Sequence, residues 1–185
     1  MNRALPPHII RRRRIAGLVI LALIVWLVWS AVAFVIGLFH PGNKAANVSA
    51  CAPGTVAVTA FAGDGMNHVA DFPNGQKPLI WFSVVNTGKV ACSFNTGAAV
   101  QFYRIKSADQ VIWDSKQCNR AGLGNQDTVL KPGKPIASPA GEWFRVYSSN
   151  AGCGEGQAPA AAGAYSLIAE VNGVVSANYE QFTIE

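Results

Sequence analysis

The chain has 185 residues, a formal net charge of +5 and four cysteines. Five arginines near the N-terminus, Arg3 and Arg11 to Arg14, account for that charge, because ten basic and ten acidic residues balance from Lys44 onward. The basic character is therefore a property of the tail and gives no sign of a nucleic-acid-binding face, which would carry its positive charge on the folded part, so we expect no nucleic-acid partner.

A basic tail followed by a long apolar run opens the chain. Residues 1–14 end in four consecutive arginines, and residues 15–39 form 25 consecutive positions without a charged side chain. A helix of that length spans roughly 37 Å, enough for a hydrocarbon core of about 30 Å. The run is too long for the apolar part of a cleaved signal peptide. It predicts one uncleaved transmembrane α-helix, the conformation that satisfies an isolated backbone in lipid.

The arginines predict the orientation of that helix. Arg11, Arg12, Arg13 and Arg14 abut the apolar run on its N-terminal side, whereas His40-Pro41-Gly42-Asn43-Lys44 follows it. Cationic flanks remain in the cytoplasm, so these arginines are topogenic residues. Binding of membrane lipid head groups is a second role open to them, although the topogenic role already explains their presence. We expect a single-pass plasma-membrane protein with a cytoplasmic N-terminus and an extracytoplasmic C-terminal domain.

Residues 40–53 are predicted to be a linker, with one chemical alternative at its end. Val48-Ser49-Ala50-Cys51 resembles a bacterial lipobox, in which Cys51 would be lipidated and become the N-terminus. A lipobox normally abuts the apolar run, and here polar residues intervene. We therefore expect Cys51 to form a disulfide.

All four cysteines lie beyond the apolar run, at Cys51, Cys92, Cys118 and Cys153. An even number on the oxidising side of a membrane predicts two disulfides. Their spacing lacks the close pairs of a zinc site. Four cysteines allow three pairings, of which Cys92–Cys118 with Cys51–Cys153 is favoured because Cys92 and Cys118 flank adjacent predicted strands.

Residues 54–185 show short apolar runs separated by Gly, Pro and Asn turns, without an amphipathic helix. This spacing predicts an all-β domain, an antiparallel β-sandwich. The predicted strands are 55–61, 78–85, 90–94, 100–105, 111–113, 129–130, 142–147, 164–171 and 179–184.

The order of short motifs along residues 78–170 resembles the immunoglobulin-like family that includes the BsuPI-type proteinase inhibitors. It also resembles anchored domains of actinobacterial single-pass membrane proteins. The resemblance implies an Ig-like β-sandwich and raises protease inhibition as a function. This chain differs in its four cysteines, its apolar anchor and an Ala-Gly where the family has Pro-Gly. The motifs are Val85-Asn86-Thr87-Gly88, Ile105, Val111-Ile112-Trp113-Asp114-Ser115, Leu130-Lys131-Pro132-Gly133, Trp143 and Ala162-Gly163-Ala164-Tyr165.

No catalytic, cofactor-binding or metal-ligating set emerges from the sequence. His68 lies near Asp64 and Asp71, but all three belong to one polar stretch, 63–75, that reads as a solvated loop. Asp64, Asn67 and Asp71 do not follow the spacing of a known calcium loop. The glycines of 152–156 lack the Lys-Ser/Thr of a phosphate loop. Three tryptophans in predicted strands, Trp81, Trp113 and Trp143, are assigned to the core.

The sequence therefore favours a non-enzymatic envelope protein whose outer domain binds or supports another membrane or envelope protein. One alternative is a membrane-anchored protease inhibitor acting through an exposed loop at 63–75 or 118–128. A second is an accessory subunit of a larger membrane complex. No small-molecule substrate is evident.

Overall fold

The computed structural model describes residues 26–27 and 48–185. The chain divides into two compact units, Met1–Ala46 and Asn47–Glu185. Arg11 to Arg14 and nearly all of the predicted transmembrane segment 15–39 lie outside the described residues; Trp26 and Leu27, which are described, are helical. Within the described part of the chain, no helix combines the length and hydrophobicity needed to cross a bilayer.

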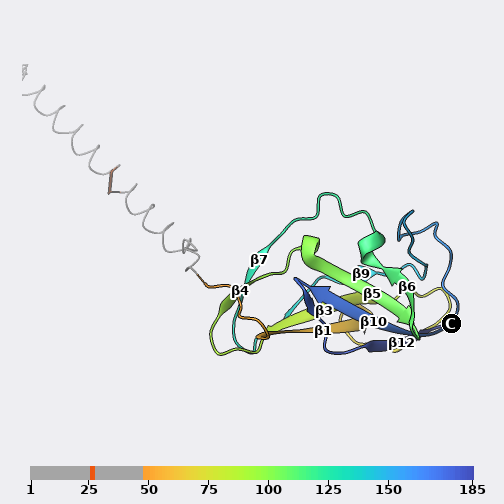
Figure 1. Ribbon diagram of the computed structural model, residues 1–185, viewed down its shortest axis with the longest axis horizontal. Helices are drawn as coiled ribbons and strands as arrows, with labels where there is room; N and C mark the ends of the chain where they lie inside the picture. The colour runs from red at the N-terminus through yellow and green to blue at the C-terminus, as the bar shows by residue number, and fades with distance from the viewer. Residues whose placement is uncertain (1–25, 28–47) are drawn as a thin grey trace, which may run out of the picture. The chain divides into compact units, whose positions relative to one another are not determined.

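The second unit is all-β, as predicted. Figure 1 shows its strands as two layers, with the β4–β7 pair at one end and the C-terminus at the other. Its helical elements are two 3-10 turns, η1 (Ala98–Val100) and η2 (Ser115–Gln117). The strands are β1 (Val56–Gly63), β2 (Asp71–Phe72), β3 (Leu79–Asn86), β4 (Cys92–Asn95), β5 (Gln101–Ser107), β6 (Gln110–Asp114), β7 (Asp127–Leu130), β8 (Ile136–Ala137), β9 (Gly141–Glu142), β10 (Gly163–Val171), β11 (Val174–Val175) and β12 (Glu180–Ile184).

The strands form two main sheets and one small one. The first sheet has the order β1-β3-β8, and β9 also pairs with β3. The second has the order β2-β12-β10-β5-β6, with β11 on β10. All pairs within these sheets are antiparallel except β2, which runs parallel to β12. The third sheet is the pair β4-β7, which joins Cys92 in register with Leu130.

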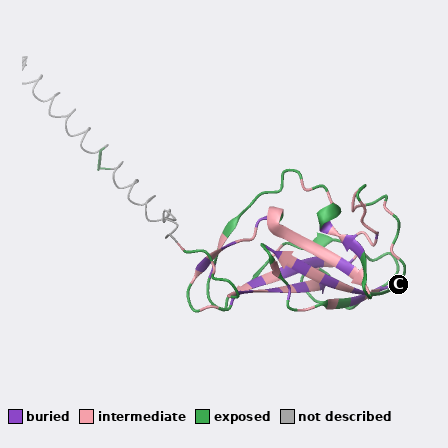
Figure 2. Ribbon diagram, in the orientation of Figure 1, coloured by how far each residue is buried: buried purple, intermediate pink, exposed green. Residues whose placement is uncertain are grey.

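Alternation along each strand places one set of side chains between the two main sheets. In β1 the alternate residues Val58, Ala60 and Ala62 are buried, and β10 alternates in the same way. Figure 2 shows buried residues alternating with intermediate ones along the strands. At the centre of the core Trp143 packs edge-on against Tyr165 and Phe182, with ring centroids 5.3 and 5.8 Å away.

Most of the predicted strands match observed ones, and the differences fall at short elements. The predicted strand 142–147 contracts to β9, because beyond Glu142 Trp143 turns into the core and Arg145 adopts φ 58°. The supposed loop 63–75 contains β2, where Phe72 is fully buried. Two-residue strands such as β2, β8 and β11 are too short to show a period in the sequence.

The folded unit begins earlier than residue 54. The backbone N–H of Cys51 donates to the carbonyl of Ser93 at 2.9 Å, and the N–H of Ser93 donates to the carbonyl of Ser49 at 2.9 Å. These bonds extend β4 on its second side. The end of the predicted linker 40–53 is therefore part of the domain, a correction that follows from a pairing between distant segments.

All four cysteines are in disulfides, but the expected pairing was wrong. The bridges are Cys51–Cys92 and Cys118–Cys153, with Cα atoms 4.7 and 4.9 Å apart. Cys51 meets Cys92 because its own segment pairs with β4. Cys118 follows η2, whereas Cys92 lies in β4, which pairs with β7. The expected Cys92–Cys118 bridge therefore does not form. With its sulfur in a disulfide, Cys51 is unavailable for a lipid thioether.

Candidate functional site

The polar residues around His68 are held by separate partners. The carboxylate of Asp64 accepts hydrogen bonds from the backbone N–H groups of Met66 and Asn67, at 2.9 and 2.7 Å, and these bonds lower its pKa. Asp71 accepts from the hydroxyl of Thr183 at 2.5 Å. Nδ1 of His68 is hydrogen-bonded to the carboxylate of Glu180 on β12. These side chains stabilise turns and strand ends and do not converge on a common point.

Within residues 26–27 and 48–185, no group of three His, Cys, Asp or Glu side chains is arranged to hold a metal ion. Of the calcium set considered above, Asp64 accepts a 3.1 Å hydrogen bond from the side-chain amide of Asn67, whereas Asp71 is bonded to Thr183 on β12. The glycine-rich stretch 152–156 forms a turn around the second disulfide. There the carbonyl of Cys153 accepts a 2.8 Å hydrogen bond from the indole N–H of Trp113.

The three tryptophans divide between two environments. Trp113 and Trp143 belong to the core, as expected. Trp81 is also buried, at 6% exposure, but it points away from the core because its strand neighbours Ile80 and Phe82 face inward. It stacks on Phe61, its cross-strand partner in β1, with ring centroids 5.5 Å apart and planes 15° from parallel.

This aromatic pair forms part of a groove on the outer face of the first sheet, which we call the outer groove. Its volume is about 370 Å³. Met66 contributes the most exposed side chain, at 86%. His68 and Ser83 provide polar groups at the margin. The lining residues are Phe61, Met66, His68, Trp81, Ser83, Pro135 and Ala137.

The outer groove was not predicted from the sequence. Residues 78–85 form an unbroken apolar run, which is typical of a strand buried on both faces. Such a run does not distinguish a side chain in the core from one on the outer face. The signal that was available is the alternation of Trp81 and Ser83 with Ile80 and Phe82, read together with Phe61 in β1.

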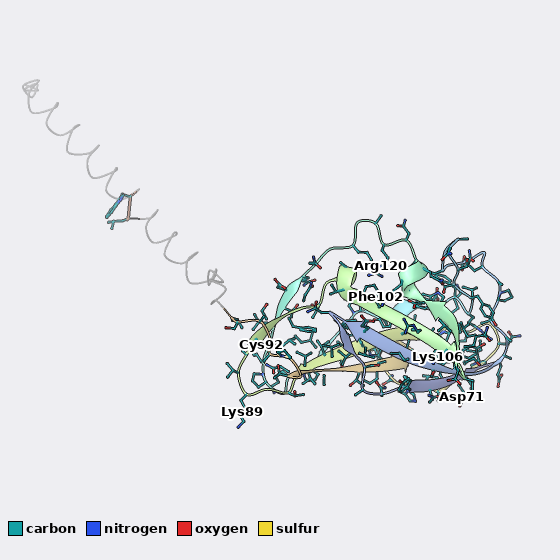
Figure 3. The ribbon with its side chains drawn as sticks, viewed as in Figure 1. Asp71, Lys89, Cys92, Phe102, Lys106 and Arg120 are labelled. Carbon is teal, nitrogen blue, oxygen red and sulfur yellow. A yellow bond between two sulfur atoms is a disulfide. The ribbon has the colours of Figure 1, made fainter. Side chains whose placement is uncertain are left out.

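A second exposed feature is the loop from Cys118 to Thr128, which Figure 1 shows projecting between η2 and β7. The Cys118–Cys153 disulfide holds its first residue. Arg120 lies 4.4 Å from the ring centroid of Phe102, beside which it is labelled in Figure 3. Its guanidinium donates to the carbonyls of Ala98, Ala99 and Gln101, at 2.7, 3.2 and 3.2 Å. Leu123, in the middle of the loop sequence, has 41% of its surface exposed.

No family model and no curated protein matches this chain. Among solved structures, similarity extends to β-glucosidases from Erythrobacter marinus (15% identity, TM-score 0.40) and Listeria innocua (9%, 0.37). It also extends to the Pseudomonas fluorescens alkylpurine DNA glycosylase AlkC bound to DNA containing an abasic site analog (13%, 0.40). The alignments cover 70 to 71% of this chain but only 15%, 16% and 30% of those proteins, respectively. Similarity at this level assigns no function.

Proposed function

We propose that this chain is a non-enzymatic, membrane-anchored protein of the cell envelope. Its outer domain is Ig-like and binds another membrane or envelope protein through the outer groove. The anchor and its orientation rest on the uncharged segment 15–39 and on Arg11 to Arg14. The two disulfides fit an oxidising compartment outside the cytoplasm.

The strand order supports the Ig-like assignment. β1, β3 and β8 correspond to strands A, B and E of an immunoglobulin domain, and β12, β10, β5 and β6 to strands G, F, C and C′. In this domain, as in an immunoglobulin domain, the two sheets share one core. The chain departs from antibody domains in its bridges, since neither disulfide joins β3 to β10.

Tyr165 gives independent support for the same assignment. It lies near the start of β10, and its hydroxyl donates a 2.5 Å hydrogen bond to the carbonyl of Ala161, four residues upstream. A tyrosine bonded in this way at the start of strand F is the tyrosine corner of Ig-like sandwiches.

The observation that carries the binding function is the outer groove. It brings the stacked pair Phe61 and Trp81 together with Met66, whose side chain is 86% exposed, along one groove of the described domain. Aromatic residues and Met are enriched in protein–protein interfaces relative to the remaining surface. Met side chains adapt to varied apolar partners. We therefore assign a protein partner with an apolar contact surface to this groove.

Site-specific photo-crosslinking in intact cells tests this function. A photoreactive amino acid replaces Met66 in the groove or, as control, Val175, which is 55% exposed on the other sheet. We expect a discrete crosslinked membrane or envelope protein from position 66 and none of the same mass from position 175. Equal products from both positions, or none from position 66, would contradict binding at the groove.

Protease inhibition is a second candidate, and the 118–128 loop is the observation that favours it. An inhibitory loop must present an exposed residue while resisting distortion, and Leu123 lies on a loop held by a disulfide and by Arg120. A panel of proteases assayed with the purified outer domain tests this function. Inhibition by the native domain that weakens at least about tenfold in Leu123→Asp would support protease inhibition. Such a change corresponds to the loss of roughly 1.4 kcal/mol of apolar burial against the protease. Absence of inhibition across the panel would exclude it.

A further inference from the structure

The cations of the outer domain divide into bonded and unbonded groups. Lys77, Arg104 and Lys116 form ion pairs with carboxylates. Arg120 and Arg145 donate to backbone carbonyls. The remaining lysines make no ion pair within residues 48–185; these are Lys89, Lys106, Lys131 and Lys134.

Three of those four lysines lie on two loops that a single buried side chain joins. Asn86, at the end of β3, is fully buried. Its amide nitrogen donates to the carbonyls of Val90 and Leu130, at 2.8 and 3.0 Å, and its amide oxygen accepts from the N–H of Gly88 at 2.8 Å. Its backbone carbonyl accepts from the N–H of Gly133 at 2.8 Å.

These bonds fix residues 87–91, which carry Lys89, beside residues 131–134, which carry the other two lysines. We call this pair of loops the basic end. The three lysines are exposed. Val90 adds an apolar side chain that is 77% exposed. Residues 86–91 and 129–136 contain no Asp or Glu, so the local charge is uniformly positive.

The basic end adjoins the first residues of the domain. The N–H of Thr87 donates to the carbonyl of Thr55 at 2.8 Å, and Cys92 is bridged to Cys51. Figure 3 shows Lys89 and Cys92 at the same end of the sandwich, with Lys106 at the opposite end. Eight residues, 40–47, separate this part of the domain from the apolar run. At 3.3–3.6 Å per residue they reach at most about 30 Å.

We propose that the basic end contacts anionic lipid head groups on the outer face of the membrane. The inference rests on the proposed membrane anchor, which keeps these loops within reach of the bilayer. Near an anionic surface each lysine strengthens association roughly fivefold, so three give on the order of 100-fold. An affinity of that size is weak for a free domain. A short tether to the membrane raises the effective concentration of the domain at the lipid surface to the millimolar range. Contact then orients the domain relative to the membrane.

Hydrogen–deuterium exchange of the full-length chain in lipid nanodiscs tests this proposal. One disc contains phosphatidylcholine alone and the other includes phosphatidylglycerol. We expect amides in 87–91 and 131–134 to exchange several-fold more slowly in the anionic disc, with the difference fading at high salt. The triple variant Lys89→Gln, Lys131→Gln, Lys134→Gln should abolish the difference, and Lys106→Gln should leave it unchanged.

The outcomes separate the lipid contact from the anchor. A chain that enters neither disc would overturn both the lipid contact and the membrane anchor. A chain that enters both discs, with the two loops exchanging equally, would overturn the lipid contact and leave the anchor standing. Slowing caused by soluble polyphosphate in phosphatidylcholine discs, without an effect of phosphatidylglycerol, would also overturn it, in favour of a soluble polyanion.

Discussion

At the scale of single residues, Asn86 joins segments that are far apart in the chain. Replacement by Ala leaves the carbonyls of Val90 and Leu130 and the N–H of Gly88 without their buried partners. We expect Asn86→Ala to lower the free energy of unfolding by about 2–4 kcal/mol. Urea unfolding of residues 47–185, followed by tryptophan fluorescence, measures it.

The matched control is Asn74→Ala. Asn74 is exposed and its side chain makes no hydrogen bond within the described residues. Asn74→Ala should therefore change the free energy of unfolding by no more than about 0.5 kcal/mol. Similar losses in the two variants would contradict the role given to Asn86.

The sequence predicted a turn at Asn86-Thr87-Gly88, and the turn is there. That the same side chain also bonds to Leu130, 44 residues further on, depends on tertiary structure and leaves no trace in local sequence.

Tyr103 gives a prediction about pH. Burial raises the pKa of its phenol to about 12 from an ordinary value of 10.0. Because the folded state holds this proton more tightly than the unfolded state does, its contribution to stability is complete below about pH 10. It is lost as pH rises from there to about 12, a change of roughly 2–3 kcal/mol.

Absorbance at 295 nm, which follows tyrosine ionisation, checks this expectation. Compared with the native chain, Tyr103→Phe should lack a step near pH 12, and its stability should fall less steeply above pH 10. An identical titration curve apart from a step lost near pH 10 would show that Tyr103 is not shielded from water.

At the scale of elements, Gly97 marks the contact between the start of η1 and the 118–128 loop. A Cβ atom at Gly97 would lie 2.4 Å from the backbone nitrogen of Gln126 and 2.4 Å from the carbonyl oxygen of Gly124. Both are backbone atoms that cannot move without shifting the loop. We expect Gly97→Ala to cost about 1–3 kcal/mol and to speed proteolysis of the loop. Gly124→Ala, where a Cβ atom meets nothing within 4 Å, is the control and should behave like the native chain.

The elements that the sequence predicted correctly are those whose own pattern determines them. β1, β5 and β10 alternate along their length, and β3 is a long apolar run that ends at the Asn86-Thr87-Gly88 turn. The disulfide pairing was wrong because it depends on Ser49–Cys51 lying along β4, a contact between segments 41 residues apart. The outer groove was missed for a related reason, since its residues come from β1, β3 and two loops that meet only in the folded domain.

At the scale of the whole molecule, equal numbers of charges do not mean an even surface. The folded part has as many basic as acidic residues, so its composition alone predicts a neutral domain. The structure pairs Lys77, Arg104 and Lys116 with carboxylates, and three of the remaining lysines gather at the basic end. Composition reports the sum of the charges, whereas recognition depends on which of them are unpaired and lie together.

The orientation of the chain gives the last prediction. If Arg11 to Arg14 retain the N-terminus in the cytoplasm, moving the positive charge across the apolar run should reverse the chain. The variant replaces all four arginines by Asn and introduces Pro41→Arg, Gly42→Arg and Asn43→Arg beside Lys44. We expect most of this variant to place the β-domain in the cytoplasm, where Cys51–Cys92 and Cys118–Cys153 stay reduced. Thiol alkylation followed by non-reducing electrophoresis measures whether the cysteines are reduced. Protease treatment of spheroplasts measures whether the β-domain is exposed outside the cell. Arg3→Asn alone, remote from the apolar run, is the control and should keep both disulfides. A variant that remains oxidised and protease-accessible outside the cell would show that the arginines do not set the orientation, and the proposed topology would then need another determinant.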